Sequence, residues 1–189
     1  MFARPAAVVA ALASPFALVA ITASPAAAEP DRAAWVERPF TVEGQLGLAS
    51  PLGVGVAADY APTSWLSVGA GVGRNSTPAT QVAVGARARV WSSPGRALFF
   101  GVAGSGGGWS EPTSDDLTRE FERAYWANAE LGVEGRAAGL SGRAFFGAAA
   151  LLNRDDWTCN TAGGCTGEVR GTVLPYFGFA LGYAFGLGG

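Results

Sequence analysis

The stretch VLPYFGFALGYAF, residues 173–185, has the residue pattern of a β-strand with two different faces. Large or apolar side chains occupy every second position: Val173, Pro175, Phe177, Phe179, Leu181, Tyr183 and Phe185. The positions between them are mostly smaller: Leu174, Tyr176, Gly178, Ala180, Gly182 and Ala184. Successive side chains of a strand point to opposite faces, so a period of two predicts a strand with one apolar face.

Seven further segments repeat this alternation upstream. They cover residues 40–48, 54–60, 66–73, 81–91, 97–109, 125–136 and 143–153. Segments of roughly ten residues, apolar on one face and small or polar on the other, are typical of transmembrane β-barrels. A secreted β-sandwich also alternates and is the alternative interpretation.

The connections favour the barrel because their lengths alternate, apart from the short first outer link at 49–53. Short links follow the second, fourth and sixth segments, at 61–64, 92–96 and 137–142. The links after the fifth and seventh segments are long, at about 15 and about 18 residues. Short inner turns that alternate with longer outer loops are the layout of outer-membrane barrels. The predicted fold class is therefore all-β, an eight-stranded antiparallel up-and-down transmembrane β-barrel.

Charge is also divided between the two faces. The predicted lipid face of the eight segments carries no charged residue, whereas the other face carries four acids and four bases. We interpret these eight residues as a charge cluster in the lumen: Glu43, Asp59, Arg87, Arg89, Glu130, Glu134, Arg136 and Arg143. Unpaired charges in a narrow interior are costly, so we expect Arg–carboxylate pairs that plug the lumen.

This pattern resembles the small eight-stranded outer-membrane barrels of Gram-negative bacteria, of the OmpA transmembrane-domain and OmpX type. The resemblance covers residues 40–185, and the aromatic-rich strand at 173–185 is similar to the C-terminal signal of that family. It implies a porin-like barrel in the cell outer membrane, in contact with lipid and lipopolysaccharide. It also implies recognition of the C-terminal strand by the outer-membrane assembly machinery.

The N-terminal segment has the composition of an export signal. Residues 1–28 carry one charge, Arg4, then an apolar run and the small residues Ala26–Ala28. These features predict a cleaved secretory signal peptide, and a membrane anchor is the alternative that Pro15 disfavours. We expect a short periplasmic segment at 29–38 and the barrel at 39–189.

The overall composition restricts the possible chemistry. The chain has 189 residues, 28 of them Gly, and no His, and its formal net charge is −2. Without His there is no Ser-His-Asp triad and no His-based zinc site, so we expect no catalytic residue, no cofactor and no metal centre. The charge balance gives no sign of a nucleic-acid partner.

Two predicted outer loops hold the remaining polar features. The loop at 110–123 is acidic, and its acids are Glu111, Asp115, Asp116, Glu120 and Glu122. A solvated loop is favoured over a cation site, with one or two helical turns over residues 117–123. The loop at 154–170 holds the only two cysteines, Cys159 and Cys165, which we expect to form a disulfide in an oxidising envelope rather than a metal site.

Three functional classes are compatible with these observations. The leading hypothesis is a monomeric outer-membrane protein with a structural or surface-interaction role and a plugged lumen. The alternative is a small channel or ligand-binding barrel, in which the same Arg and Glu residues line a narrow path. An enzyme is disfavoured because outer-membrane lipases, deacylases and proteases mostly rely on a His base.

Overall fold

A computed structural model describes residues 33–48, 50, 52–75, 79–112, 118–155, 158–159 and 173–186. The predicted signal peptide at 1–28 and Cys165 lie outside these residues. The described part contains one short helix, α3 (Ala33–Glu37), and nine strands. No helix among the described residues is long and apolar enough to span a membrane.

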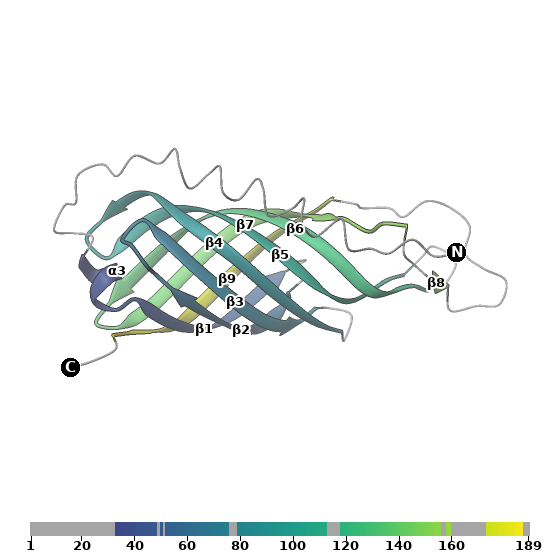
Figure 1. Cartoon of the computed structure of the whole chain (residues 1–189), viewed down its shortest axis with the longest axis horizontal. Helices are drawn as coiled ribbons and strands as arrows, with labels where there is room; N and C mark the ends of the chain where they lie inside the picture. Colours follow the sequence, from purple (N-terminus) through teal and green to yellow (C-terminus); the bar gives the residue numbers. More distant parts are fainter. Residues whose placement is uncertain are drawn as a thin grey trace. The chain divides into compact units, whose positions relative to one another are not determined.

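Eight of the strands close into an antiparallel barrel (Figure 1). In chain order they are β1 (Phe40–Leu48), β2 (Val54–Tyr60), β3 (Leu66–Arg74), β4 (Thr80–Ser93), β5 (Arg96–Pro112), β6 (Thr118–Ala137), β7 (Leu140–Leu151) and β9 (Val173–Phe185). Each barrel strand pairs with the next one along the chain, and β1 pairs with β9 from Phe40↔Phe185 to Leu48↔Phe177. The predicted eight-stranded up-and-down barrel is therefore confirmed.

The alternation in the sequence determines which side chains face the lumen. In β1 the side chains of Thr41 and Glu43 are buried, whereas those of Val42, Leu46 and Leu48 are exposed on the outer wall. In β9 the buried positions include Tyr176 and Ala180, and the phenylalanines between them face outward. Because the wall is a single sheet, a side chain that faces inward packs against lumen side chains from other strands.

The two ends of the barrel differ in their connections. At one end, which we call the terminal end, the chain enters β1, leaves β9 and makes three short turns. Two of these turns centre on Pro94–Gly95 and Ala138–Gly139, where Gly95, Ala138 and Gly139 have positive φ angles of 65°, 50° and 90°. The opposite end, which we call the loop end, carries the connections after β1, β3, β5 and β7.

The loop end departs from the sequence-based prediction over residues 118–123. These residues belong to β6 and pair with β5, with Trp109 opposite Phe121 and Glu111 opposite Arg119, so the helical turns expected there are wrong for this stretch. The β5–β6 hairpin extends beyond the other strands (Figure 1). A two-residue strand, β8 (Thr158–Cys159), pairs with β6 in this extension. Burial of Phe121 in an apolar cluster explains why strand geometry is favoured over a solvated helix.

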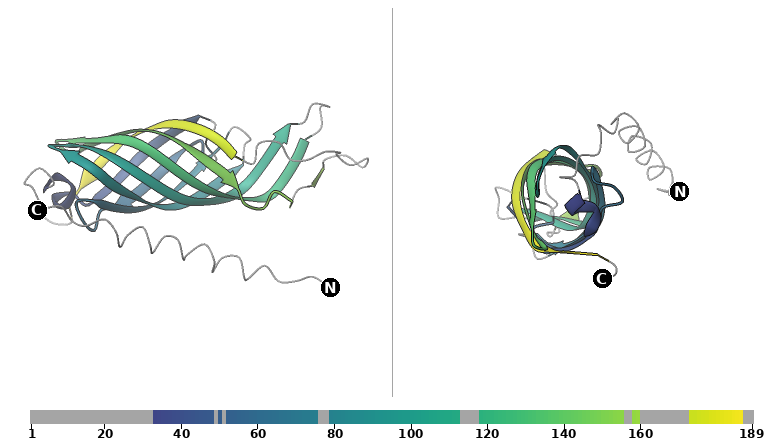
Figure 2. Two further views of the ribbon diagram at one scale, coloured as in Figure 1. Left: turned by 90° about the horizontal axis from the view of Figure 1, so that it is seen from above. Right: turned by 90° about the vertical axis from the view of Figure 1, so that its left-hand side faces the viewer.

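The helix α3 lies at the terminal end, within the ring of strands when the barrel is viewed along its axis (Figure 2). Its Trp35 has 0% of its surface exposed, whereas Val36 is 54% exposed. The segment that the sequence suggested to be a simple periplasmic lead-in therefore places one large side chain inside the barrel.

Candidate functional site: the lumen

All eight residues of the expected charge cluster lie in strands, and each is in the half of its strand nearer the terminal end. Five of them are buried: Glu43, Asp59, Arg89, Glu134 and Arg143. The side chains of Arg87 and Glu130 are 13% and 17% exposed. Seven of the eight take part in ion pairs, and we call these seven the charged layer: Glu43, Asp59, Arg87, Arg89, Glu130, Glu134 and Arg143.

Arg143 of β7 joins carboxylates from two different strands. Its Nη2 donates to Glu43 Oε1 of β1, and its Nη1 donates to Glu130 Oε1 of β6 at 3.1 Å. The pair with Glu43 spans strands that are not neighbours in the wall, because β9 lies between β1 and β7. The guanidinium therefore crosses part of the lumen.

Two further pairs complete the charged layer. Arg87 Nη2 lies 2.9 Å from Asp59 Oδ2. Arg89 donates from Nε to Glu134 Oε1 and from Nη2 to the Ser67 hydroxyl at 2.7 Å. Each guanidinium thus has at least one carboxylate partner, which offsets the cost of removing both charges from water.

Lumen glycines make room for these side chains. A Cβ atom at Gly69 of β3 would lie 2.0 Å from Asp59 Oδ1, and a Cβ at Gly101 of β5 would lie 2.7 Å from Glu130 Cγ. Real side chains do not approach so closely, so glycine at these two positions is a packing requirement of the charged layer.

Arg136, the eighth predicted residue, is held differently. No ion pair joins it to a carboxylate among the described residues. Its Nη1 donates to the Arg38 carbonyl and its Nη2 to Thr41 Oγ1, both at 2.6 Å. Its guanidinium carbon lies 4.3 Å from the centre of the Trp35 ring, and the Arg89 guanidinium carbon lies 3.9 Å from the same centre. Trp35 is therefore stacked with two arginines at the terminal end.

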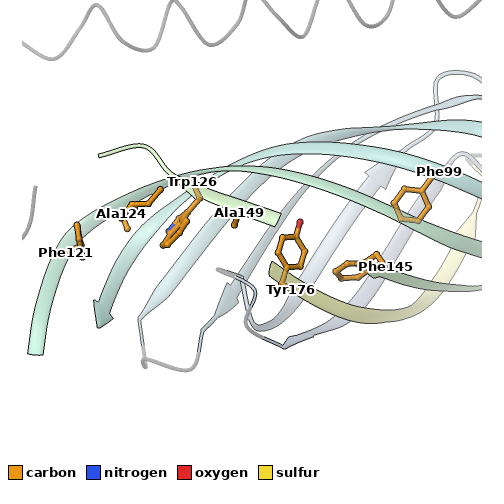
Figure 3. Packing of buried hydrophobic residues seen from close by; sticks show 8 residues of the cluster. Phe99, Phe121, Ala124, Trp126, Phe145, Ala149 and Tyr176 are labelled. Atoms are coloured by element: carbon orange, nitrogen blue, oxygen red, sulfur yellow. The ribbon is translucent and has the colours of Figure 1, made fainter. Parts of the chain in front are cut away.

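Apolar side chains fill the lumen from the charged layer toward the loop end. We call this set the aromatic cluster (Figure 3): Phe99, Phe121, Ala124, Trp126, Phe145, Ala149, Leu151 and Tyr176, with Trp109 and Leu174 packed against it. Trp109 and Trp126 meet edge to face at 5.0 Å, and Phe145 and Tyr176 meet in the same way at 6.2 Å. The cluster touches the charged layer where the Arg143 guanidinium carbon lies 4.8 Å from the Phe145 ring centre.

A small cavity of about 100 Å³ is lined by residues of both regions. Its charged and polar lining includes Asp59, Arg87, Glu130, Arg143, Asn128 and Tyr176. Asn128 Nδ2 donates to Ser105 Oγ at 3.1 Å beside it. The cavity is large enough for several water molecules, and its polar atoms could bind them or a small polar ligand.

Sequence reasoning did not identify Trp35, Ser67 or the lumen aromatic residues as parts of the site. Alternation places Phe99, Trp126 and Tyr176 on the inner face, but it does not show that they form one cluster. For Trp35 the available signal was a single Trp in the sequence AAWVE directly before the first strand.

The remaining sequence-based expectations concern the loops. Cys159 lies in β8, and Cys165 lies outside the described residues, so the disulfide stays a prediction. Among the described residues no group of three or more His, Cys, Asp or Glu side chains is arranged to hold a metal ion. Asp115 and Asp116 lie outside the described residues.

One comparison with a known structure supports the fold. No protein-family model matches the chain, and no curated protein matches it. Among solved structures, the N-terminal β-barrel domain of Pseudomonas aeruginosa OprF is similar, with a TM-score of 0.51 and 11% sequence identity over 78% of this chain and 98% of that one. Acinetobacter baumannii CarO matches with a TM-score of 0.42 and 11% identity over the same shares. The closed eight-stranded antiparallel barrel of this chain is therefore similar in fold to the N-terminal β-barrel domain of OprF.

Proposed function

We propose that this chain is an outer-membrane β-barrel with a closed lumen and a structural or surface-interaction role. Three features of the described residues support this proposal: the apolar outer wall, the paired charges in the lumen and the aromatic cluster next to them. The single observation that carries it is the double ion pair of Arg143 with Glu43 and Glu130, which places charged side chains across the lumen.

The outer wall supports a membrane environment. Large apolar side chains face outward on all eight barrel strands, among them Val56, Val72, Val84, Leu98, Leu131, Phe146 and Leu181. Soluble monomers rarely expose apolar patches of more than a few hundred Å². A closed sheet also bonds all its backbone groups internally, which is the condition for crossing lipid.

Aromatic side chains near the terminal end are consistent with a membrane boundary there. Phe40 lies 4.9 Å from Tyr60 and 5.9 Å from Phe185, measured between ring centres, and the outward faces of β1, β2 and β9 carry them. Aromatic girdles of this kind mark the interfaces of membrane barrels. We assign the terminal end to the periplasmic side, because short periplasmic turns are typical of such barrels.

The proposal extends to export, assembly and contacts of the chain. We infer a cleaved signal peptide at 1–28, recognition of the β9 sequence by the assembly machinery, and a monomer surrounded by lipid and lipopolysaccharide. A Cys159–Cys165 disulfide would then close the loop after β7 on the outer side. Outer-membrane fractionation, together with a gel-mobility shift on boiling, tests the location, and recovery of the protein in the soluble periplasm would contradict it.

Planar-bilayer recording tests the closed lumen. We expect the purified wild-type barrel to give no steady conductance, because the charged layer fills the lumen. A large steady conductance from the wild-type protein would contradict the plug.

The cavity of about 100 Å³ supports a second candidate, a small channel or ligand-binding barrel. In that case Arg87 and Glu130, which line the cavity, would set the ion selectivity of a low conductance. The separate substitutions Arg87→Met and Glu130→Gln would then shift the reversal potential in opposite directions. Absence of permeation in the wild type and in both variants would exclude the channel.

A further inference from the structure

The helix α3 is attached to the barrel interior through one side chain. Trp35 is fully buried, whereas Val36 and Glu37 on the same helix are exposed. The α3 residues form no part of the sheet, and the paired region of β1 begins at Phe40. The contact of α3 with the lumen is therefore concentrated in the Trp35 ring.

The Trp35 ring lies between the lumen charges and the opening at the terminal end. Arg89 and Arg136 stack with it from β4 and β6, at 3.9 Å and 4.3 Å. Arg89 in turn contacts Glu134 and Ser67. Removal of the ring would leave these polar groups next to the opening.

Residues 38 and 39, which connect α3 to β1, are held by contacts with the barrel, whereas α3 is not paired with a strand. Arg38 provides a carbonyl to Arg136, and its side chain lies against the turn at Gly139, where a Cβ atom would meet Arg38 Nη1 at 2.6 Å. The Pro39 carbonyl accepts a hydrogen bond from Ala61 N at 2.8 Å. The chain is thus anchored at residues 38–39, and α3 lies beyond the anchor.

The polar groups at the stack are not all satisfied. The indole Nε1 of Trp35 and the Nε of Arg136 are buried, and neither has a hydrogen-bond partner among the described residues. Water would supply partners for both if the ring withdrew, which lowers the cost of opening. Among aromatic rings, Trp forms the most favourable cation–π contact with a guanidinium. The two arginines therefore stabilise the Trp35 ring in its closed position.

We propose that α3 is a gate at the terminal end of the lumen, with Trp35 as its closing side chain. When Trp35 withdraws, solvent reaches the terminal side of the charged layer, and the barrel wall does not rearrange. This inference rests on the proposed closed lumen. It assigns the main barrier in the lumen to the charged layer and a second barrier, at the terminal opening, to Trp35.

The test measures access to two lumen positions on either side of the charged layer. Thr41→Cys reports the terminal side, because Thr41 is buried near the start of β1 and its Oγ1 contacts Arg136, which stacks with Trp35. Ser105→Cys reports the other side, because Ser105 lines the cavity toward the loop end. Both are made in a Cys159→Ser, Cys165→Ser background, with and without Trp35→Ala. The folded barrel in detergent micelles is treated with a small hydrophilic methanethiosulfonate reagent, and mass spectrometry gives the rate of labelling.

We expect Trp35→Ala to accelerate labelling at Thr41→Cys at least roughly tenfold, which corresponds to about 1.4 kcal/mol in the free energy of opening. Labelling at Ser105→Cys is expected to stay the same, because the charged layer and the wall are unchanged. The mobility shift on boiling reports that the variant is folded. Trp35→Phe keeps a ring in place with a weaker cation–π contact, so its acceleration is expected to be smaller and to test the gate if the alanine variant does not fold.

The outcomes separate the gate from the closed lumen. Equal labelling of Thr41→Cys with native Trp35, with Trp35→Phe and with Trp35→Ala overturns the gate and leaves the closed lumen intact. An equal acceleration at both positions overturns the claim that the wall and the charged layer are unaffected. A conducting wild-type barrel in planar bilayers contradicts the closed lumen directly, whatever the labelling rates.

Discussion

The charged layer and the aromatic cluster fill the same tube by different means. In the charged layer three arginines meet four carboxylates, and the contacts are directional hydrogen bonds such as Arg143 Nη1 to Glu130 Oε1. In the aromatic cluster the contacts are between rings, such as Trp109 with Trp126 at 5.0 Å. The stability of the charged layer therefore depends on which charged partners are present. The stability of the aromatic cluster depends on how completely its side chains fill the lumen.

This difference predicts different responses to substitution. Removing one partner from a buried ion pair leaves an uncompensated charge, and removing the other partner as well relieves that cost. Removing a ring leaves a cavity that no second polar substitution repairs. For every variant, urea unfolding of the barrel in lipid vesicles gives the free energy of unfolding, which is compared with that of the wild type.

Arg143→Met is expected to have the largest effect. It leaves the buried Glu43 and the mostly buried Glu130 without their shared guanidinium, and we expect a loss of about 4 kcal/mol. The triple variant with Glu43→Gln and Glu130→Gln removes all three charges and should recover most of the loss. A triple variant as unstable as Arg143→Met would show that the contact acts through packing alone, and the contrast with the aromatic cluster would then fail.

Trp126→Ala is expected to cost slightly less, about 3 kcal/mol, because it removes a buried ring and its edge-to-face contact with Trp109. Trp126→Phe keeps most of the volume, and the indole Nε1 has no hydrogen-bond partner in the part of the chain that the structure describes, so this control should lose only about 1 kcal/mol. A phenylalanine variant as unstable as the alanine variant would indicate a specific polar role for the indole.

The two regions also differ in how far the sequence predicts them. Strict alternation fixes the inner face, so the bounds of β1 and β2 agree with those expected, and Glu43 and Asp59 point into the lumen as expected. Which carboxylate Arg143 contacts depends on the stagger of the strands around the barrel, and a single strand pattern does not contain that information.

Two parts of the structure were not predicted, for physical reasons. The start of β6 has the charged sequence TREFER, and local propensity favours a helix there, whereas packing of Phe121 against the cluster favours a strand. Trp35 is held by Arg89 and Arg136, which are distant in the sequence, so no local pattern reports its burial.

Val84→Arg places an arginine on the outer face of β4, the strand whose inner face already carries Arg87. Arg87 faces inward and is paired, whereas Val84 is 66% exposed on the outer face near the middle of β4. An arginine facing lipid near the midplane is expected to cost about 2 kcal/mol. Val54→Arg, at the loop end of β2, should cost less than about 1 kcal/mol because it lies near the interface. Equal, small costs at both positions would contradict a bilayer around the wall.

The smallest effect comes from a matched pair of serines, of which Ser67 contacts the charged layer and Ser105 contacts only the neutral Asn128. Ser67 Oγ accepts a hydrogen bond from the Arg89 guanidinium at 2.7 Å, and Ser105 Oγ accepts one from the Asn128 amide at 3.1 Å. Both serines are buried, so substitution with alanine removes the same atom from each. A hydrogen bond to a charged group contributes more than a neutral one, so we expect a loss of about 1.5 kcal/mol for Ser67→Ala and about 0.7 kcal/mol for Ser105→Ala. Equal losses would mean that Glu134 already satisfies Arg89, and that the charged layer depends less on its individual partners than its geometry suggests.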